Sequence, residues 1–358
     1  MSKSEYKVIG LMSGTSIDGL DIAFSHYSIE NGNWSYELIN SRNVDYSVEM
    51  KIRLKNSVNL PGLELQLLNN EYGRWLGEQV KKFVDDHRIN PDFVASHGHT
   101  VFHQIDKKFT LQIGSGWELG NTCGITTVCD FRSLDVALGG QGAPLVPIGD
   151  HLLLSEYDFC LNLGGISNVS FILDGERVAF DIGVANMLLN HLCSQINLDF
   201  DDEGQIAKSG SLDQQLLEAL NNLDYHRLTF PKSTGYEWFV DEIMPIVDTS
   251  TSSVKDKLHT SVHHIAELVK KALTHYAKPG SNMIITGGGA KNTFLIELLK
   301  KKLKPNINII KPSPELISFK EAIVFGLMGV LRMRGETNCL KSVTGASRDS
   351  SCGIIFTA

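Results

Sequence analysis

Residues 9–24 read IGLMSGTSIDGLDIAF, and the rest of the chain is built around this stretch. Two apolar runs flank a short loop of Gly, Ser, Thr and Asp, which is the pattern of a β-hairpin. Asp18-Gly19 supplies the turn, because glycine has no Cβ and accepts positive φ. The loop gathers hydroxyls and uncovered backbone N–H groups, which can bind an oxyanion such as phosphate. The alternative is an ordinary hairpin with a polar tip.

The same order of elements returns in the second half of the chain. We predict a strand over 158–163, a turn rich in small polar residues over 164–168, strands over 169–173 and 177–180, and a helix over 185–196. Strand, glycine-rich turn, strand, strand, helix also describes the first part, with strands over 6–11, 20–25 and 34–39 and a helix over 63–88. We interpret this as a structural duplication, in which two facing hairpin tips hold one polyphosphate.

The remaining pattern is mostly helical, with short buried strands. We expect strands over 92–96, 283–285 and 306–310, helices over 257–276, 293–303 and 319–333, and an irregular tail over 339–358. Gly326 and Gly329 on the 319–333 helix indicate close packing. Gly287, Gly288 and Gly289 lie between a strand and a helix, a design that lets a ring or phosphate approach the backbone and the helix N-terminus.

Length and composition restrict the class of protein. The chain has 358 residues, 42% of them hydrophobic, so two domains and a sizeable core are expected. A net charge of −8 argues against nucleic-acid binding. The polar N-terminus predicts no signal peptide, no apolar run is long enough for a membrane span, and six scattered cysteines without a C-x-x-C pair favour a reduced, cytoplasmic location.

Well-known nucleotide motifs are missing from the sequence. It contains no G-x-x-x-x-G-K-[ST] P-loop, no G-x-G-x-x-G after a strand and no protein-kinase signature. His97, His99 and His103 form a cluster that could bind zinc if His97 and His99 share one face of a strand; a polar wall of an active site is the alternative.

Several polar residues allow two interpretations. Asp181 ends a buried strand, where a carboxylate is either catalytic or a helix N-cap. Asp130 and Arg132 follow another strand and either serve a site or pair with each other. Lys232-Ser233-Thr234-Gly235 is either an anion-contacting loop or a solvated turn, and Glu321 is either a helix-dipole partner or a site acid.

Taken together, these motifs resemble the anhydro-N-acetylmuramic acid kinases, bacterial sugar kinases of the superfamily that includes hexokinase, actin and Hsp70 ATPase domains. The resemblance runs from about residue 7 to residue 345. It is carried by residues 10–21, Ser96-His97-Gly98, Asp130-Phe131-Arg132, and the segments 139–147, 161–168, 231–235, 287–290 and 343–346.

The resemblance implies an α/β, two-domain actin-like ATPase (ribonuclease H-like) fold, with duplicated β-β-β-α cores around a deep cleft. The expected first domain is 1–133 plus about 335–358, and the second is 134–334 with the catalytic Asp and the adenosine loop. The implied reaction opens the internal 1,6-anhydro bridge of the sugar with water and transfers the γ-phosphate of ATP to O6. The product is N-acetylmuramic acid 6-phosphate, a step in recycling peptidoglycan.

The resemblance also assigns roles to residues of this sequence. Asp181 matches the catalytic carboxylate, the base that activates water. The expected ATP-binding residues are Gly14, Thr15, Ser16, Ile17, Asp18, Gly19, Leu20, Asp21, Gly164, Gly165, Ser167, Gly287, Gly288 and Gly289. The expected sugar-binding residues are Ser13, His97, Arg132, Asn186 and Glu321. Mg²⁺ is expected at Asp18 and Asp21, since it prefers oxygen ligands. A small-molecule sugar is the expected partner, no nucleic acid or membrane is expected, and a homodimer is plausible by resemblance.

The sequence departs from the family pattern near Asp181. The usual segment Phe-Asp-Thr-Gly-Pro-Gly-Asn is here Phe-Asp-Ile-Gly-Val-Ala-Asn, at residues 180–186. His99 stands where Gln is usual, and Tyr236 where Arg is usual. Three alternatives therefore stay open: a kinase for another anhydro sugar such as levoglucosan, a non-catalytic nucleotide-binding sugar sensor, and a zinc hydrolase built on the three histidines.

Overall fold

The computed structural model describes residues 3–14, 17 and 19–358, and it divides into two compact units. The first is Met1–Ser155 with Phe319–Ala358, and the second is Glu156–Ser318. These boundaries differ from the expected ones, because residues 134–155 and 319–334 pack with the first unit. Two helices explain the difference: Val324 of α13 (Pro314–Arg334) packs against Gly149 of α5 (Pro147–Leu153), and α13 also contacts the first sheet.

The sheet of the first unit has six strands in the order β13-β7-β4-β1-β2-β3. The strands β1, β2 and β3 are antiparallel neighbours, whereas β4 and β7 continue the sheet parallel to β1. Their bounds are β1 Glu5–Ser13, β2 Gly19–Glu30, β3 Asn33–Asp45, β4 Phe93–Ser96, β7 Thr127–Cys129 and β13 Ile354–Phe356.

The sheet of the second unit has five strands in the order β10-β9-β8-β11-β12. Again the strands β8, β9 and β10 are antiparallel neighbours, and β11 and β12 continue the sheet parallel to β8. Their bounds are β8 Phe159–Leu163, β9 Ile166–Leu173, β10 Glu176–Val184, β11 Ser281–Thr286 and β12 Ile307–Ile310. Apart from the edge strand β13, which has no counterpart in the second sheet, both sheets share one order and one set of strand directions. This confirms the predicted duplication and the ribonuclease H-like fold.

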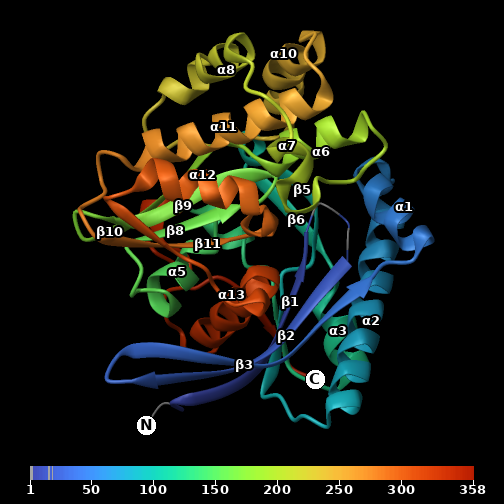
Figure 1. Ribbon diagram of the computed structural model, residues 1–358. Coiled ribbons are helices and arrows are strands. Elements are labelled where there is room, and N and C mark those ends of the chain that lie inside the picture. The colour runs from blue at the N-terminus through green and yellow to red at the C-terminus, as the bar shows by residue number, and fades with distance from the viewer. Residues whose placement is uncertain (1–2, 15–16, 18) are drawn as a thin grey trace. The chain divides into compact units, whose positions relative to one another are not determined.

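Long helices bury the apolar faces of the first sheet. The helix α2 (Gly62–His87) packs beside α3 (Gly116–Cys123), as Figure 1 shows. The helix α13 contacts β1 and β2 at very close range: a Cβ at Gly10 would lie 1.9 Å from the carbonyl oxygen of Ala322, and one at Gly326 would lie 2.3 Å from the hydroxyl of Tyr27. The predicted role of Gly326 in close packing is therefore confirmed.

In the second unit, α11 (Val254–Leu273) is the central helix of the core. It contacts β10, α6 (Asn186–Ser194), α8 (Gln214–Asn221) and α12 (Thr293–Leu303). Along α11 the residues Leu258, Val262, Ile265, Val269 and Leu273 are fully buried at helical spacing, as the pattern predicted. The helices α8 and α10 lie outside α11 in Figure 1.

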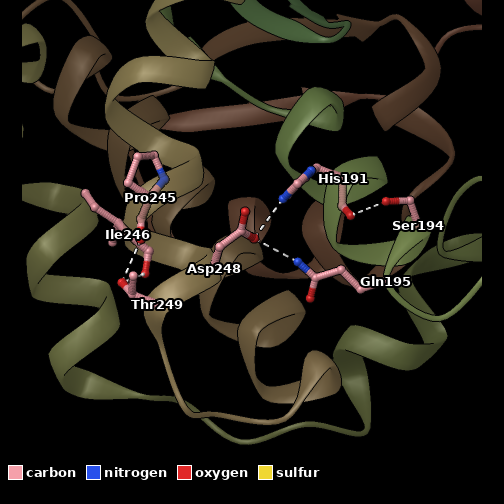
Figure 2. Close-up of polar contacts among 7 residues, drawn as sticks. All are labelled: His191, Ser194, Gln195, Pro245, Ile246, Asp248 and Thr249. Carbon is pink, nitrogen blue, oxygen red and sulfur yellow. Dashed lines mark hydrogen bonds and ion pairs between the residues drawn. The ribbon is translucent and has the colours of Figure 1, made fainter.

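A polar contact ties α6 to α10 (Met244–Thr249), and Figure 2 shows it. Oδ1 of Asp248 accepts a hydrogen bond from Nε2 of Gln195 at 2.8 Å and lies 2.9 Å from Nε2 of His191. Because α6 begins at Asn186, this contact also holds the helix that starts beside the predicted nucleotide loops.

The sequence missed or misjudged several elements. The tail, expected to be irregular, contains α14 (Lys341–Thr344) and the edge strand β13, which pairs with β7. A two-stranded sheet of β5 (His99–Gln104) and β6 (Phe109–Ile113) was not predicted. The helices α3, α5, α8 and α10 were also not predicted. The same holds for α1 Val48–Asn56, α4 Ser133–Ala137, α7 Gln205–Lys208 and α9 Tyr236–Trp238, the last followed by a π-helical turn over Phe239–Ile243. Among the described residues, no helix is both long and apolar enough to span a bilayer.

Candidate active site

Asp181 lies at a β-bulge near the carboxyl end of β10. Asp181 pairs with Asn168 of β9, but Gly183 pairs with the adjacent Ser167, so Ile182 is an extra residue in the strand. Such a bulge reorients the side chains around it. Ile182 stands where the family pattern has Thr. Its side chain is buried in the core of the second unit and packs against other apolar groups.

The loop after cis-Pro231 encloses Asp181. The backbone N–H of Thr234 donates to Oδ2 of Asp181 at 3.1 Å, and the N–H of Asp181 donates to the carbonyl of Lys232 at 3.2 Å. The hydroxyl of Tyr225 donates to the carbonyl of Asp181 at 2.9 Å. The structure therefore brings the Lys-Ser-Thr-Gly loop to this carboxylate. Tyr225 was not predicted, and no sequence motif marks it.

The environment of Asp181 makes its carboxyl group a weaker acid than usual. Burial raises its pKa from 3.8 to about 6, although the Thr234 N–H and the Lys232 charge act in the opposite direction. A carboxylate with a pKa near neutrality accepts a proton effectively at physiological pH. The helix N-cap interpretation does not apply, because α6 starts at Asn186 after the N-cap residue Ala185.

Two glycine loops of the second unit meet at Asn186. Nδ2 of Asn186 donates to the carbonyl of Leu163 at 3.0 Å, and its backbone N–H donates to the carbonyl of Gly164 at 3.1 Å. On the other side, a Cβ at Gly289 would lie 3.1 Å from Oδ1 of Asn186. Gly165 and Gly288 are exposed, so this corner presents bare backbone to a ligand.

Ser167 has a structural contact at this corner. Its side chain is buried and its Oγ donates to the carbonyl of Gly183 at 2.9 Å. Gly287 has a φ of +80°, and a Cβ there would lie 2.5 Å from Oδ1 of Asn162, so only glycine fits. The structure thus brings together Gly164, Gly165, Asn186 and Gly287–Gly289, which are far apart in the sequence.

In the first unit, His97 and Arg132 form a hydrogen-bonded pair. Nε of Arg132 donates to Nε2 of His97 at 2.9 Å, and its Nη1 donates to the carbonyl of Gly142 at 2.6 Å. An arginine N–H can only donate, so Nε2 of His97 is the acceptor and Nδ1 carries the proton that goes to the carbonyl of Gly98 at 2.8 Å. Burial, and then the charge of Arg132, lower the pKa of His97 well below its usual value, so the ring is neutral.

The other sugar-contact candidates of the first unit lie around this pair. The hydroxyl of Ser13 is buried and donates to the same Gly98 carbonyl at 2.8 Å. Glu321 is exposed at the start of the α13 segment in this unit and acts electrostatically on Arg132. Asp130 does not pair with Arg132; its Oδ1 accepts from the N–H of Ser133 at 3.2 Å. Asn186 belongs to the second unit and is not part of this group.

The tip of the first hairpin is described only in part, since Thr15, Ser16 and Asp18 lie outside the described residues. Ile17 has a φ of +57°, and its N–H donates to the carbonyl of Gly14 at 3.3 Å. Leu20 is buried in the core, so only its backbone can face a ligand. Oδ1 of Asp21 accepts from Nδ2 of Asn43 at 2.9 Å.

The described residues do not by themselves form a metal centre. Among them, no three His, Cys, Asp or Glu side chains lie close enough together to hold a metal ion. The zinc interpretation required His97 and His99 on one face of a strand, but β4 ends at Ser96 and Gly98 turns the chain with a φ of +74°. At the hairpin tip, Asp21 is the single described carboxylate of the two expected magnesium ligands.

Comparison with known proteins gives a consistent family. Residues 6–358 match the family model described as anhydro-N-acetylmuramic acid kinase. A protein of that name from Vibrio cholerae is 34% identical over 97% of this chain and 97% of its own, and one from Francisella tularensis subsp. novicida is 33% identical over 96% and 97%. Among solved structures, component A of (R)-2-hydroxyglutaryl-CoA dehydratase from Acidaminococcus fermentans is 10% identical, with a TM-score of 0.46 over 91% of this chain and 97% of that one.

Proposed function

Since the chain belongs to the anhydro-N-acetylmuramic acid kinase family, we propose that it is an ATP-dependent kinase of 1,6-anhydro-N-acetylmuramic acid. One water and one ATP are consumed for each sugar. Water adds to the anomeric carbon as the 1,6-anhydro bond breaks, O6 attacks the γ-phosphoryl group, and ADP leaves. The product is N-acetylmuramic acid 6-phosphate, which belongs to peptidoglycan recycling.

Asp181 carries this proposal. As the base, its carboxylate takes a proton from the attacking water, which requires an ionised group with a pKa not far below the working pH. The pKa of about 6 and the fixed orientation given by the Thr234 N–H support that role. In this proposal Tyr225 and Lys232 act as positioning residues, since they contact the backbone of Asp181.

The ATP contacts are assigned to the glycine loops. In the second unit, the exposed backbone of Gly165 and Gly288, with the half-buried Gly164 beside them, supports a close approach by adenosine or phosphate. Ser167 contributes by fixing β9 to β10 instead of touching ATP, because its hydroxyl is engaged with Gly183. In the first unit we retain Gly14–Asp21 as the second phosphate loop.

The sugar contacts are assigned to Arg132 and its neighbours. Both ring nitrogens of His97 are engaged, so His97 orients Arg132 and does not contact the sugar itself. The guanidinium has five N–H donors, and these contacts with His97 and Gly142 use two. We retain Ser13 and Glu321, which lie near Arg132, as proposed sugar-binding residues. We assign Asn186 to the nucleotide loops, in place of the sugar, because it holds them together.

We also retain Mg²⁺ at Asp18 and Asp21 and a homodimer as proposals. Magnesium bound with ATP would neutralise phosphate charge; the described residues supply only Asp21 for it, so no step of this account depends on the ion. Replacing Asp21 by Asn while measuring the Mg²⁺ concentration for half-maximal activity tests the metal, and light scattering after size exclusion tests the dimer.

The experiment that tests the function is a coupled ADP-release assay with 1,6-anhydro-N-acetylmuramic acid, comparing the wild type with Asp181→Asn. The substitution keeps the size of the side chain and removes the base. We expect sugar-dependent ADP release by the wild type and a loss of about 10²-fold or more in the variant. Levoglucosan serves as the comparison substrate: faster turnover of levoglucosan, or no sugar-dependent turnover at all, would contradict the proposal.

A further inference from the structure

The second unit contains a pocket of about 270 Å³ that is lined in part by the two neighbours of Asp181 on β10, Phe180 and Ile182. Three segments line it: β10 at Phe180 and Ile182, the segment 226–232, and the C-terminal end of α11 with the residues just beyond it. None of the residues assigned above to ATP or sugar lines this pocket. Lys232, a positioning residue of Asp181, is the one residue that the pocket shares with the proposed catalytic group.

One wall of the pocket is aromatic. The rings of Phe180 and Phe230 are stacked, with centroids 5.4 Å apart and planes 7° from parallel. Tyr276 meets Phe230 edge to face at 6.1 Å. Flat apolar surfaces of this kind suit a planar or compact apolar group, which gains from offset stacking as well as from burial.

The pocket is also lined by positively charged side chains. Arg227, Lys232 and Lys271 line it, and no Asp or Glu does, in a chain whose net charge is −8. Arg227 pairs with the exposed Asp224 at 3.2 Å, whereas in the part of the chain that the structure describes no carboxylate lies within ion-pair distance of Lys232 or Lys271. Nζ of Lys232 donates to the carbonyl of Tyr225 at 3.3 Å.

The buried ring of His226, in addition to the positive charge, indicates a ligand. Its side chain lines the pocket and is only 5% exposed, yet neither ring nitrogen has a hydrogen-bond partner among the described residues. Buried polar atoms are nearly always paired with protein, water or ligand. Burial, and then the charges of Lys232 and Lys271, lower the pKa of His226 to about 4. Burial and the charge of Lys271 lower the pKa of Lys232, although the charge of Asp181 acts in the opposite direction. An anion placed among these groups would relieve this mutual repulsion.

We propose that this pocket binds a small organic anion, a carboxylate or phosphate attached to an apolar ring, with the ring on the aromatic wall and the anion between Lys232 and Lys271. This site goes beyond the proposed kinase function. Because Lys232 also accepts the Asp181 N–H through its carbonyl, an occupant holds the segment 226–234 against β10.

Calorimetric titration of the full chain tests the site with four probes: phenyl phosphate, phenylacetate, inorganic phosphate and benzyl alcohol. We expect phenyl phosphate and phenylacetate to bind with dissociation constants in the millimolar range or below, and each single-feature probe to bind more weakly. The better of the two ring-bearing probes identifies the preferred anion. Equal binding of inorganic phosphate and phenyl phosphate, or no binding of either ring-bearing anion, would overturn the proposal.

Two lysines of α11 provide a matched pair of variants. Lys271 lines the pocket, while its exposed neighbour Lys270 does not. Lys271→Gln should weaken binding of phenyl phosphate about fivefold, the size expected for one partly exposed charge contact, and Lys270→Gln should leave it unchanged. The same loss in both variants would indicate general electrostatic attraction and contradict the site.

Hydrogen exchange measures the effect on the 226–234 segment without any kinase assay. Saturating phenyl phosphate should slow amide exchange in peptides covering this segment in the wild type, and much less in Lys271→Gln. Binding that is displaced by ATP or by the sugar would locate the probe in the catalytic site and would overturn the inference, whatever the outcome for the kinase activity.

Discussion

The backbone N–H of Thr234 donates to Oδ2 of Asp181 at 3.1 Å, so a loop far along the chain orients a carboxylate at the bulge of β10. The contact is made through the backbone, and it does not depend on the side chain at position 234. It engages one carboxylate oxygen of Asp181, and in the proposed mechanism the other oxygen takes the proton from water.

The pH dependence of the activity should follow Asp181. Its pKa is raised to about 6, and the base works only when ionised, so kcat/KM should fall as the pH drops through about 6. The charge of Lys232 lowers this pKa, so Lys232→Gln should move the acidic limb upward by about half a pH unit or more. A pH profile of kcat/KM measures both effects. Lys270→Gln is the control, and an acidic limb that stays in place in Lys232→Gln would contradict the assignment.

The pair of His97 and Arg132 should be sensitive to a conservative change. In Arg132→Lys the planar fork that reaches both His97 and the carbonyl of Gly142 is lost, because an ammonium group cannot reproduce it. We expect the variant to lose about 1–2 kcal/mol of unfolding free energy. Relative to the wild type, its KM for the sugar should rise more than its KM for ATP. Denaturant unfolding and steady-state kinetics measure these.

Arg74→Lys is the control for that prediction. Arg74 makes an exposed ion pair with Glu118 at 3.1 Å, and exposed pairs contribute little. Equal changes in sugar and ATP kinetics for Arg132→Lys would argue that the pair stabilises the fold without serving the sugar site.

Two glycines with similar φ values differ in how crowded their surroundings are. Gly287 has a φ of +80° and Gly280 a φ of +87°, but a Cβ at 287 would lie 2.5 Å from Oδ1 of Asn162, whereas one at 280 has no atom within 4 Å. Gly280→Ala should lose about 1–2 kcal/mol of unfolding free energy from its positive φ. Gly287→Ala should lose more, because a φ of 80° with a ψ of 167° suits essentially only glycine and the added Cβ would clash with Asn162. Only Gly287→Ala should also raise the KM for ATP, by about tenfold, which corresponds to a loss of about 1.4 kcal/mol.

That comparison is read from thermal unfolding together with ATP kinetics. If Gly280→Ala raises the KM for ATP as much as Gly287→Ala does, the effect is a general loss of stability, and the 287–289 loop is not the nucleotide contact.

The contact of Asp248 with His191 and Gln195 should stabilise the second unit (Figure 2). Asp248→Ala removes the acceptor for both side chains, and we expect a loss of about 1 kcal/mol in the free energy of unfolding. The surface pair of Asp224 and Arg227 offers the control, since Asp224→Ala removes an ion pair between two largely exposed side chains. Similar unfolding midpoints for the two variants would show that the tie between α6 and α10 contributes nothing beyond a surface ion pair.

The sequence by itself determined the repeated elements and the family. Alternating apolar runs around Asp18-Gly19 and Gly164-Gly165 predicted two hairpins, and periodicity predicted the helices over 63–88, 257–276 and 293–303, because burial of one face imposes a local pattern. The structure has these at α2, α11 and α12 with small shifts at the ends. Where the pattern was weak, as in α1, β13 and the β5–β6 hairpin, the prediction failed, since short elements at edges depend on distant partners.

Only the tertiary structure decided which polar groups meet. Nothing local in the sequence links Thr234 to Asp181, Arg132 to His97, or Asn186 to both glycine loops, because hydrogen bonds between distant segments depend on where the sheet brings them. The tertiary structure also decided the protonation of Asp181 and His97, since burial sets the cost of charge and no residue carries its own burial in the sequence. The sequence determined which residues are available for the chemistry, and packing decided how each of them is oriented and charged.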